Sequence, residues 1–314
     1  MLRLNNTYAA FFITISLAAT LARGQDPVFR AETRLVVLHA SVLDRGGKLL
    51  TDLPQKAFRV YENGVEQEIR LFKREDIPVS LGLVIDNSGS MRPRRQQVEA
   101  AALQLVKASN PQDQVFIVNF NDEAYLDCPF TNDIAKLEEG VSRIDSRGGT
   151  AMRDAISMSI DYMRDEGKLD KKVILALTDG IDNMSSETLE QLVRKAQQAE
   201  VLIYVIGLPD EELKREFRTA KRALDSIASS SGGLSYYPQE LTEVEQIALQ
   251  IAHEIRNQYI IAYTPSNTSL DGSYRQIRVA VEGPNRPTAR TRTGYYATPE
   301  PRQKAAAAKP SVAP

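Results

Sequence analysis

The chain has 314 residues, of which 42% are hydrophobic and 25% charged, and its formal net charge is -2. This composition is ordinary for a globular protein and allows one large or two modest domains. The small net charge argues against nucleic acid or an acidic membrane as the general partner. Cys128 is the single cysteine, so an internal disulfide is excluded. We expect Cys128 to be a half-buried hydrophobic side chain on an edge strand, with a reactive thiol or an intermolecular disulfide as the alternative.

The amino terminus has the anatomy of a secretory signal peptide over residues 1–24. Arg3 precedes an apolar stretch at 9–22, and Ala22 and Gly24 place small residues just before Gln25. The apolar stretch is short for a bilayer span, although an uncleaved anchor is the alternative. No later segment is long and apolar enough to cross a membrane. We therefore expect an exported mature chain that is periplasmic, secreted or held at the cell surface.

Residues 28–75 are predicted to form a small β segment. The stretch 33–43 is strand-like, 58–62 alternates apolar and polar residues, and Asn63-Gly64 is a strong hairpin signal before a returning strand at 65–72. This segment is too short to bury a core alone.

Residues 78–257 change to alternating strands and helices. The strands are expected at 79–85, 114–120, 124–129, 172–178, 201–206 and 234–237. The helices are expected at 94–108, 134–144, 151–164, 186–199, 211–229 and 241–257. Several strands are almost continuously apolar, as strands covered on both faces should be. The pattern predicts an α/β fold with a doubly wound, mostly parallel six-stranded sheet, which binds ligands at the carboxyl ends of its strands.

β character returns after the last helix, with strands expected at 258–263, 274–281 and 289–296. We expect residues 258–298 to pair with the amino-terminal β segment as a small β-sandwich, so that the α/β domain is inserted between its halves. Residues 299–314 are rich in Ala, Pro and Lys without an apolar period, and predict a disordered tail.

Three oxygen-bearing side chains, Asp86, Ser88 and Ser90, follow the apolar strand on one tight turn. Their alternate spacing points them the same way, and Gly89 lets the backbone bend. Two later residues fit the same site: Thr150 follows Gly-Gly and opens a helix, and Asp179 ends a second apolar strand. Carboxylate and hydroxyl oxygens suit Mg²⁺ or Mn²⁺ better than zinc.

These motifs resemble the von Willebrand factor type A domain and its metal-ion-dependent adhesion site. All five positions that the family uses are present: Asp86, Ser88, Ser90, Thr150 and Asp179. The resemblance implies that the hydroxyls are neutral metal ligands, that the aspartates act largely through waters, and that the metal is Mg²⁺, with Mn²⁺ or Ca²⁺ as alternatives. It implies a protein partner whose Asp or Glu carboxylate completes the coordination. A type A fold with a vestigial site is the other interpretation.

A wider likeness covers nearly the whole mature chain. Residues 60–69, 257–265, 272–279 and 292–296 are similar to a bacterial group described as von Willebrand type A-related proteins of acidobacterial type. This likeness implies an exported protein whose biological role is largely unassigned.

The loops around the motif are expected to set selectivity. Arg92, Glu123 and Asp182 are candidates for a partner-binding rim, with solvated loop charge as their alternative role. Arg92, Arg94 and Arg95 would steer an acidic partner or simply form a solvated helix start. Asp154 is expected to serve helix-start electrostatics.

Catalytic signals are weak. The segment around His253 lacks the second histidine of a zinc hydrolase helix, and no Gly-x-Ser-x-Gly elbow occurs. We therefore predict a non-enzymatic, metal-dependent adhesion module. A scaffold in which the metal only stabilises loops is the alternative, and an enzyme whose cation activates water is a third hypothesis.

Overall fold

A computed structural model of the protein describes residues 35–142, 146–208, 214–283 and 285–299. All of them belong to one of the two units of the chain, Arg34–Pro314. The expected signal peptide and the expected tail beyond residue 299 lie outside the described residues. None of the helices in these ranges is both long enough and apolar enough to cross a membrane.

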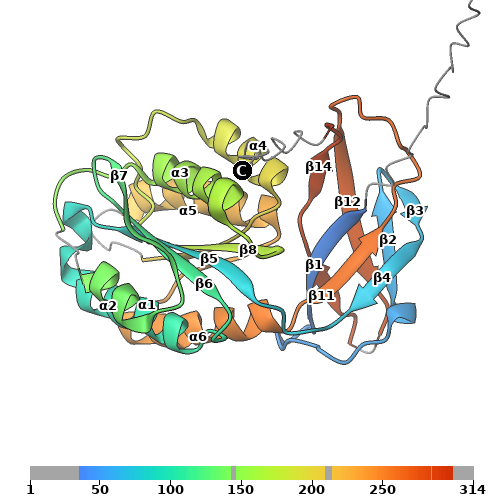
Figure 1. Ribbon diagram of the computed structural model, residues 1–314, viewed down its shortest axis with the longest axis horizontal. Coiled ribbons are helices and arrows are strands. Elements are labelled where there is room, and N and C mark those ends of the chain that lie inside the picture. Colours follow the sequence, from blue (N-terminus) through green and yellow to red (C-terminus); the bar gives the residue numbers. More distant parts are fainter. Residues whose placement is uncertain (1–34, 143–145, 209–213, 284, 300–314) are drawn as a thin grey trace, which may run out of the picture. The chain divides into compact units, whose positions relative to one another are not determined.

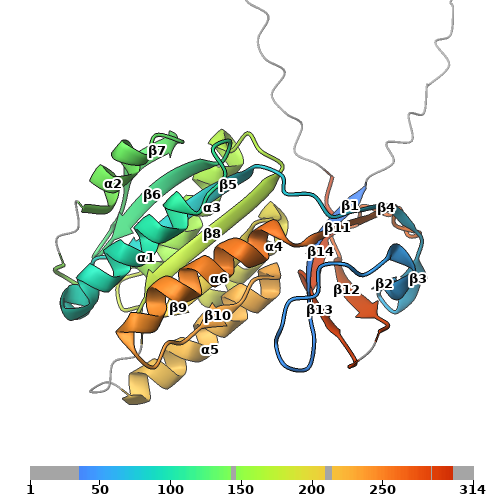
Figure 2. The ribbon, with the colours of Figure 1, turned by 90° about the horizontal axis from the view of Figure 1, so that it is seen from below.

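The central sheet has six strands in the order β10-β9-β8-β5-β6-β7 (Figures 1 and 2). All neighbours are parallel except β6 and β7, which pair antiparallel. The mostly parallel sheet is as predicted, and the apolar runs that suggested it are buried on both faces. The strand bounds are β5 Val79–Asp86, β6 Gln114–Phe120, β7 Ala124–Thr131, β8 Lys171–Thr178, β9 Leu202–Gly207 and β10 Ser235–Tyr236.

Helices cover both faces of this sheet (Figures 1 and 2). One face packs against α1 (Arg95–Lys107), α2 (Ile134–Ser142) and α6 (Val244–Arg256). The other packs against α3 (Met152–Glu166), α4 (Leu189–Ala199) and α5 (Lys214–Ser231). Alternate residues of each strand enter the two cores, so that Leu83 and Ile85 face α1 while Val84 faces α3. Short 3₁₀ turns are Gln55–Ala57 (η1), Gly89–Arg94 (η2) and Leu241–Glu243 (η3).

The flanking segments form two four-stranded antiparallel sheets, ordered β13-β1-β11-β4 and β14-β12-β2-β3. Each sheet mixes strands from both ends of the chain, and the two share one apolar core, so the predicted pairing of the segments is confirmed. The strand bounds are β1 Val36–Leu43, β2 Phe58–Glu62, β3 Val65–Gln67, β4 Ile69–Lys73, β11 Tyr259–Tyr263, β12 Tyr274–Val281, β13 Thr288–Arg290 and β14 Gly294–Tyr296. The domain limits at residues 75–78 and 257–258 stay a prediction.

Two expected strands are each divided between the two sheets. The stretch 65–72 forms β3 and β4, and the stretch 289–296 forms β13 and β14. In the second case the strand is interrupted at residues 291–293, where the Arg292 guanidinium binds Glu200 and the Val37 carbonyl. Cys128 is buried on β7, an edge strand, and makes no disulfide.

Candidate metal centre

Asp86 is the last residue of β5 and is almost fully buried, with 1% exposure. Its Oδ1 accepts a hydrogen bond from the Ser88 amide at 2.8 Å. Its Oδ2 accepts one from the Thr178 hydroxyl at 2.6 Å. Thr178 ends β8, the parallel neighbour of β5, so the pairing of these two strands holds the carboxylate at their common carboxyl edge.

A line of hydroxyls connects this edge to the second carboxylate. Ser88 Oγ and Ser90 Oγ are 3.0 Å apart, and Ser90 Oγ donates to Asp179 Oδ2 at 2.5 Å. The other oxygen of Asp179 accepts from the Ile181 amide at 3.1 Å. Four of the five side chains expected to share a site therefore lie in one chain of contacts, which begins at Asp86.

Thr150 is held beside this group by its backbone. The Gly89 amide donates to the Gly148 carbonyl at 3.2 Å, which ties the loop before Thr150 to the serine turn. The Thr150 amide donates to Asn183 Oδ1 at 2.9 Å. Within the described part of the chain the Thr150 hydroxyl makes no hydrogen bond, so it remains able to serve as a ligand. The turn needs Gly148 because its φ is +74°, in the region that disfavours other residues.

Asp86 and Asp179 are two neighbouring buried carboxyl groups, with 1% and 0% exposure. Burial, and then the neighbouring charge of Asp179, raise the pKa of Asp86 to about 7. A bound cation would offset both effects. Among the described residues no three His, Cys, Asp or Glu side chains gather in a metal-binding arrangement. Two carboxylates among several hydroxyls thus form an oxygen-only donor set, which fits a hard cation such as Mg²⁺.

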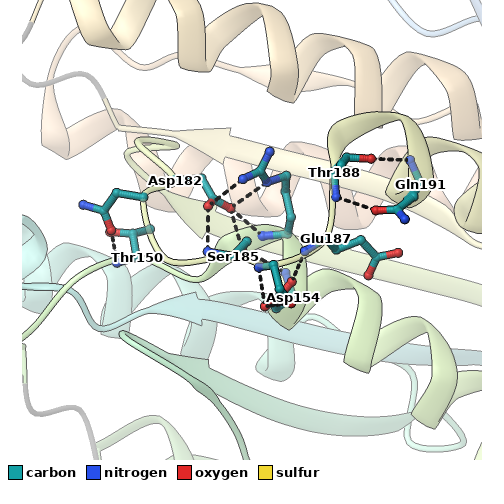
Figure 3. Close-up of polar contacts among 10 residues, drawn as sticks. Thr150, Asp154, Asp182, Ser185, Glu187, Thr188 and Gln191 are labelled. Carbon is teal, nitrogen blue, oxygen red and sulfur yellow. Dashed lines mark hydrogen bonds and ion pairs between the residues drawn. The ribbon is translucent and has the colours of Figure 1, made fainter.

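Two further aspartates hold the loop from Gly180 to Thr188 (Figure 3). Asp182 accepts hydrogen bonds from the backbone and guanidinium of Arg153 and from the Ser185 hydroxyl. Asp154 accepts from the amides of Ser186 and Glu187 at 2.9 Å each. The side chain of Asp182 is only 8% exposed, so the structure places it as a support of the loop. Asp154 fixes the same loop in addition to its expected role at the start of α3.

The other rim candidates have different surroundings. Arg92 is exposed, and its Nη2 donates to the Ser146 carbonyl at 3.0 Å. Glu123 is exposed, and no contact within the described residues ties its carboxylate to the site. Its neighbour Asp122, which the sequence reasoning missed, accepts from the Gly149 amide at 2.6 Å. The sequence feature that could have identified Asp122 is its position just after β6, at the same carboxyl edge of the sheet.

The mostly parallel six-stranded sheet and its covering helices have the fold of a von Willebrand factor type A domain. Residues 81–181 match the family model described as von Willebrand factor type A domain. The chain therefore contains such a domain.

Similarity to individual proteins is modest. The chain is 26% identical over 226 residues to inter-alpha-trypsin inhibitor heavy chain H4 of Sus scrofa, covering 66% of this chain and 24% of that protein. It is 25% identical over 207 residues to inter alpha-trypsin inhibitor, heavy chain 4, of Mus musculus, covering 59% and 21% respectively. The chain thus spans about a quarter or less of these two relatives. Proximal thread matrix protein 1 from the mussel byssus aligns with a TM-score of 0.50 and 18% identity, covering 62% of this chain and 51% of that one. This structural match supports the fold alone.

Proposed function

We propose that the protein is an exported, non-catalytic binding module that captures an acidic group of a protein partner through a divalent cation. The observation that carries this proposal is a series of contacts in which Asp86 accepts from the Ser88 amide, the Ser88 and Ser90 hydroxyls meet, and Ser90 donates to Asp179. It lies at the carboxyl edge of a mostly parallel sheet, where folds of this kind bind ligands.

The neutral and the charged residues of the site would have different roles. Ser88, Ser90 and Thr150 would hold the cation with neutral oxygens, while Asp86 and Asp179 supply the negative charge from a buried position. When bound, Mg²⁺ supplies an electrophilic position that favours a carboxylate oxygen. Exposed Arg92, anchored on the Ser146 carbonyl, would attract an acidic partner from the rim.

Binding without catalysis is the better interpretation of the surrounding groups. Neither serine of the site has a histidine as a hydrogen-bond partner among the described residues. His39 lies on β1 of a flanking sheet and His253 is exposed on α6. A serine nucleophile needs such a base within hydrogen-bond reach.

Calorimetric titration of Mg²⁺ and Mn²⁺ into chelator-treated protein tests the metal site. We expect saturable binding close to one site per chain. Ser90→Ala removes the hydroxyl that joins Ser88 to Asp179, and should weaken metal affinity about tenfold or more. Ser269→Ala, an exposed serine in the turn before β12, is the matched control and should bind as the wild type does.

Capture of a carboxylate is tested separately, with immobilised peptides that carry one Asp or Glu and matched peptides that carry Asn or Gln. Retention should require both the acid and Mg²⁺. Equal retention of acid and amide peptides, or retention that survives chelator, would favour the scaffold interpretation and contradict this proposal.

A further inference from the structure

A cavity lies away from the metal centre, at the amino-terminal ends of strands β8 and β9 of the central sheet. Its volume is about 630 Å³, which is in the range of small-molecule sites. Lys172 and Leu202, which line it, lie at the starts of β8 and β9. Both strands run from this cavity towards the edge that carries Asp179, so the two sites occupy opposite ends of the same parallel strands.

The facing wall is one surface of the sheet β13-β1-β11-β4. His39 on β1 pairs with Ile260 on β11, and Ile260 pairs with Lys73 on β4, so these three side chains share a face. Val37 and Leu71 lie on the same face two residues away. The other face of β1 carries the apolar residues of the sandwich core. The pairing of β1 with β13 matches Ser41 with Arg290. Beyond the end of β13, the Arg292 guanidinium reaches β1 and donates to the Val37 carbonyl.

Three polar atoms at this wall are buried without a hydrogen-bond partner: Arg292 Nε, Thr291 Oγ1 and His39 Nδ1. Arg292 is the most constrained, because its side chain is only 7% exposed and its terminal nitrogens are taken by Glu200 at 2.7 Å and the Val37 carbonyl at 3.0 Å. Its Nε–H can only donate. Leaving such groups unpaired costs free energy, and an acceptor in the cavity would supply the missing partner of the Arg292 Nε–H.

The other lining residues indicate which kind of ligand would present that acceptor. About half of the remaining lining residues are aliphatic, including Val37, Leu71, Leu202 and Ile260. Four basic side chains (Lys, Arg) and three acidic ones line the cavity, which gives it a slight excess of positive charge. Burial and the nearby cations Lys171 and Arg292 lower the pKa of His39 to about 3, so at neutral pH its ring is uncharged and offers Nδ1 as a hydrogen-bonding atom.

We propose that this cavity is a binding site for a small organic carboxylate with an apolar body. The carboxylate accepts from Arg292 Nε and the Thr291 hydroxyl and meets His39 Nδ1, while the apolar body lies against the aliphatic wall. This site does not depend on the metal centre or on the function proposed for it.

Hexanoate is the probe, titrated by calorimetry into the full chain in the presence of EDTA, with uncharged hexanamide as the matched ligand. The chelator prevents a carboxylate from binding through a divalent cation, so the metal centre does not contribute. We expect saturable hexanoate binding with about one site per chain, at least tenfold tighter than hexanamide. Asp179→Ala, which alters the metal centre, should leave this affinity unchanged.

Thr291→Val tests the polar end of the cavity, since it replaces the unpaired hydroxyl with a methyl group of similar size. Hexanoate affinity should fall about tenfold with little change in melting temperature. Thr288→Val, on the exposed part of the same edge, is the matched control and should bind normally.

Three results would overturn the proposal: no saturable binding of millimolar hexanoate, equal affinities for hexanoate and hexanamide, or Thr291→Val binding as tightly as Thr288→Val. The comparison of the two ligands uses the wild-type chain, so it decides the question even where a variant folds poorly.

Discussion

At the residue scale, His39 links the ionisation of one side chain to the stability of the fold. It lies on β1 with Nδ1 buried and unpaired. Burial, followed by the charges of Lys171 and Arg292, lowers its pKa from 6.5 to about 3. The unfolded chain therefore binds a proton at His39 more readily than the folded chain does. The stability that the folded chain gains from keeping His39 neutral is fully present above about pH 6.5. It is lost as the pH falls towards 3.

His39→Gln should therefore reduce the acid sensitivity of the protein. Between pH 7.5 and pH 4.5 the wild type should lose about 2 kcal/mol more unfolding free energy than the variant does, because protonation of His39 opposes folding over this range. Urea unfolding at the two pH values measures the difference. His253→Gln changes the exposed histidine of α6 and should keep the wild-type acid sensitivity. Equal pH dependence in all three proteins would contradict the assignment to His39.

The sequence reasoning reached the candidate site residues through motifs that are local in the chain. Asp86, Ser88 and Ser90 occur within one turn, and each of the two remaining candidates follows a recognisable glycine or strand pattern. The residues that it missed act across loops. Asp122 and Asn183 follow other strands and accept hydrogen bonds from the loop before α3. Because they are distant from that loop in the sequence, no periodic pattern predicts these contacts. Whether the five candidates hold a metal stays a prediction.

At the scale of elements, long apolar strands were predictable and short connecting strands were not. β8 and β9 contain continuous apolar runs, which predict strands that are buried on both faces of the sheet. The stretch 65–72 alternates like one strand, yet it crosses between two sheets at Glu68. Because each half pairs with strands distant in sequence, local alternation does not reveal the crossing. The start of α4 was predicted too early, since the helix begins after a capping box at Thr188 and Gln191.

The capping box makes α4 sensitive to one hydroxyl. Thr188 Oγ1 accepts from the Gln191 amide at 3.2 Å, and the Gln191 side chain accepts from the Thr188 amide at 2.8 Å. Thr188→Ala should lower the unfolding free energy by about 1 kcal/mol and speed hydrogen exchange in the first turn of α4. Thr188→Ser keeps the hydroxyl and should remain close to the wild type. A serine variant as destabilised as the alanine variant would show that the cap does not stabilise the helix.

At the scale of the whole described unit, Glu254 connects the central sheet with the flanking sheets. This buried residue of α6 accepts from Tyr204 on β9 at 2.7 Å and from Ser41 on β1 at 2.8 Å. It also pairs with Arg290 on β13 and accepts from Tyr236 on β10. Elements from both ends of the chain thus contact one carboxylate. We therefore expect the central sheet and the flanking sheets to unfold together.

Glu254→Ala should lower the unfolding free energy by about 3 kcal/mol, because it removes the shared acceptor of Arg290, of half-buried Tyr236 and of fully buried Tyr204. Urea unfolding followed by circular dichroism measures this loss. Glu245→Ala removes an exposed glutamate from the first turn of the same helix and should cost less than 1 kcal/mol.

The double variant Glu254→Ala with Arg290→Ala separates the ion pair from the rest of the network. If the pair carries the connection, the double variant should lose at least 1 kcal/mol less than the sum of the single losses, since the second change removes a charge already left without its partner. Strict additivity would mean that the tyrosines and Ser41 hold Glu254 independently of Arg290. The flanking sheets would then be joined to α6 through β1 rather than through β13, because Ser41 is the remaining partner of Glu254 in those sheets.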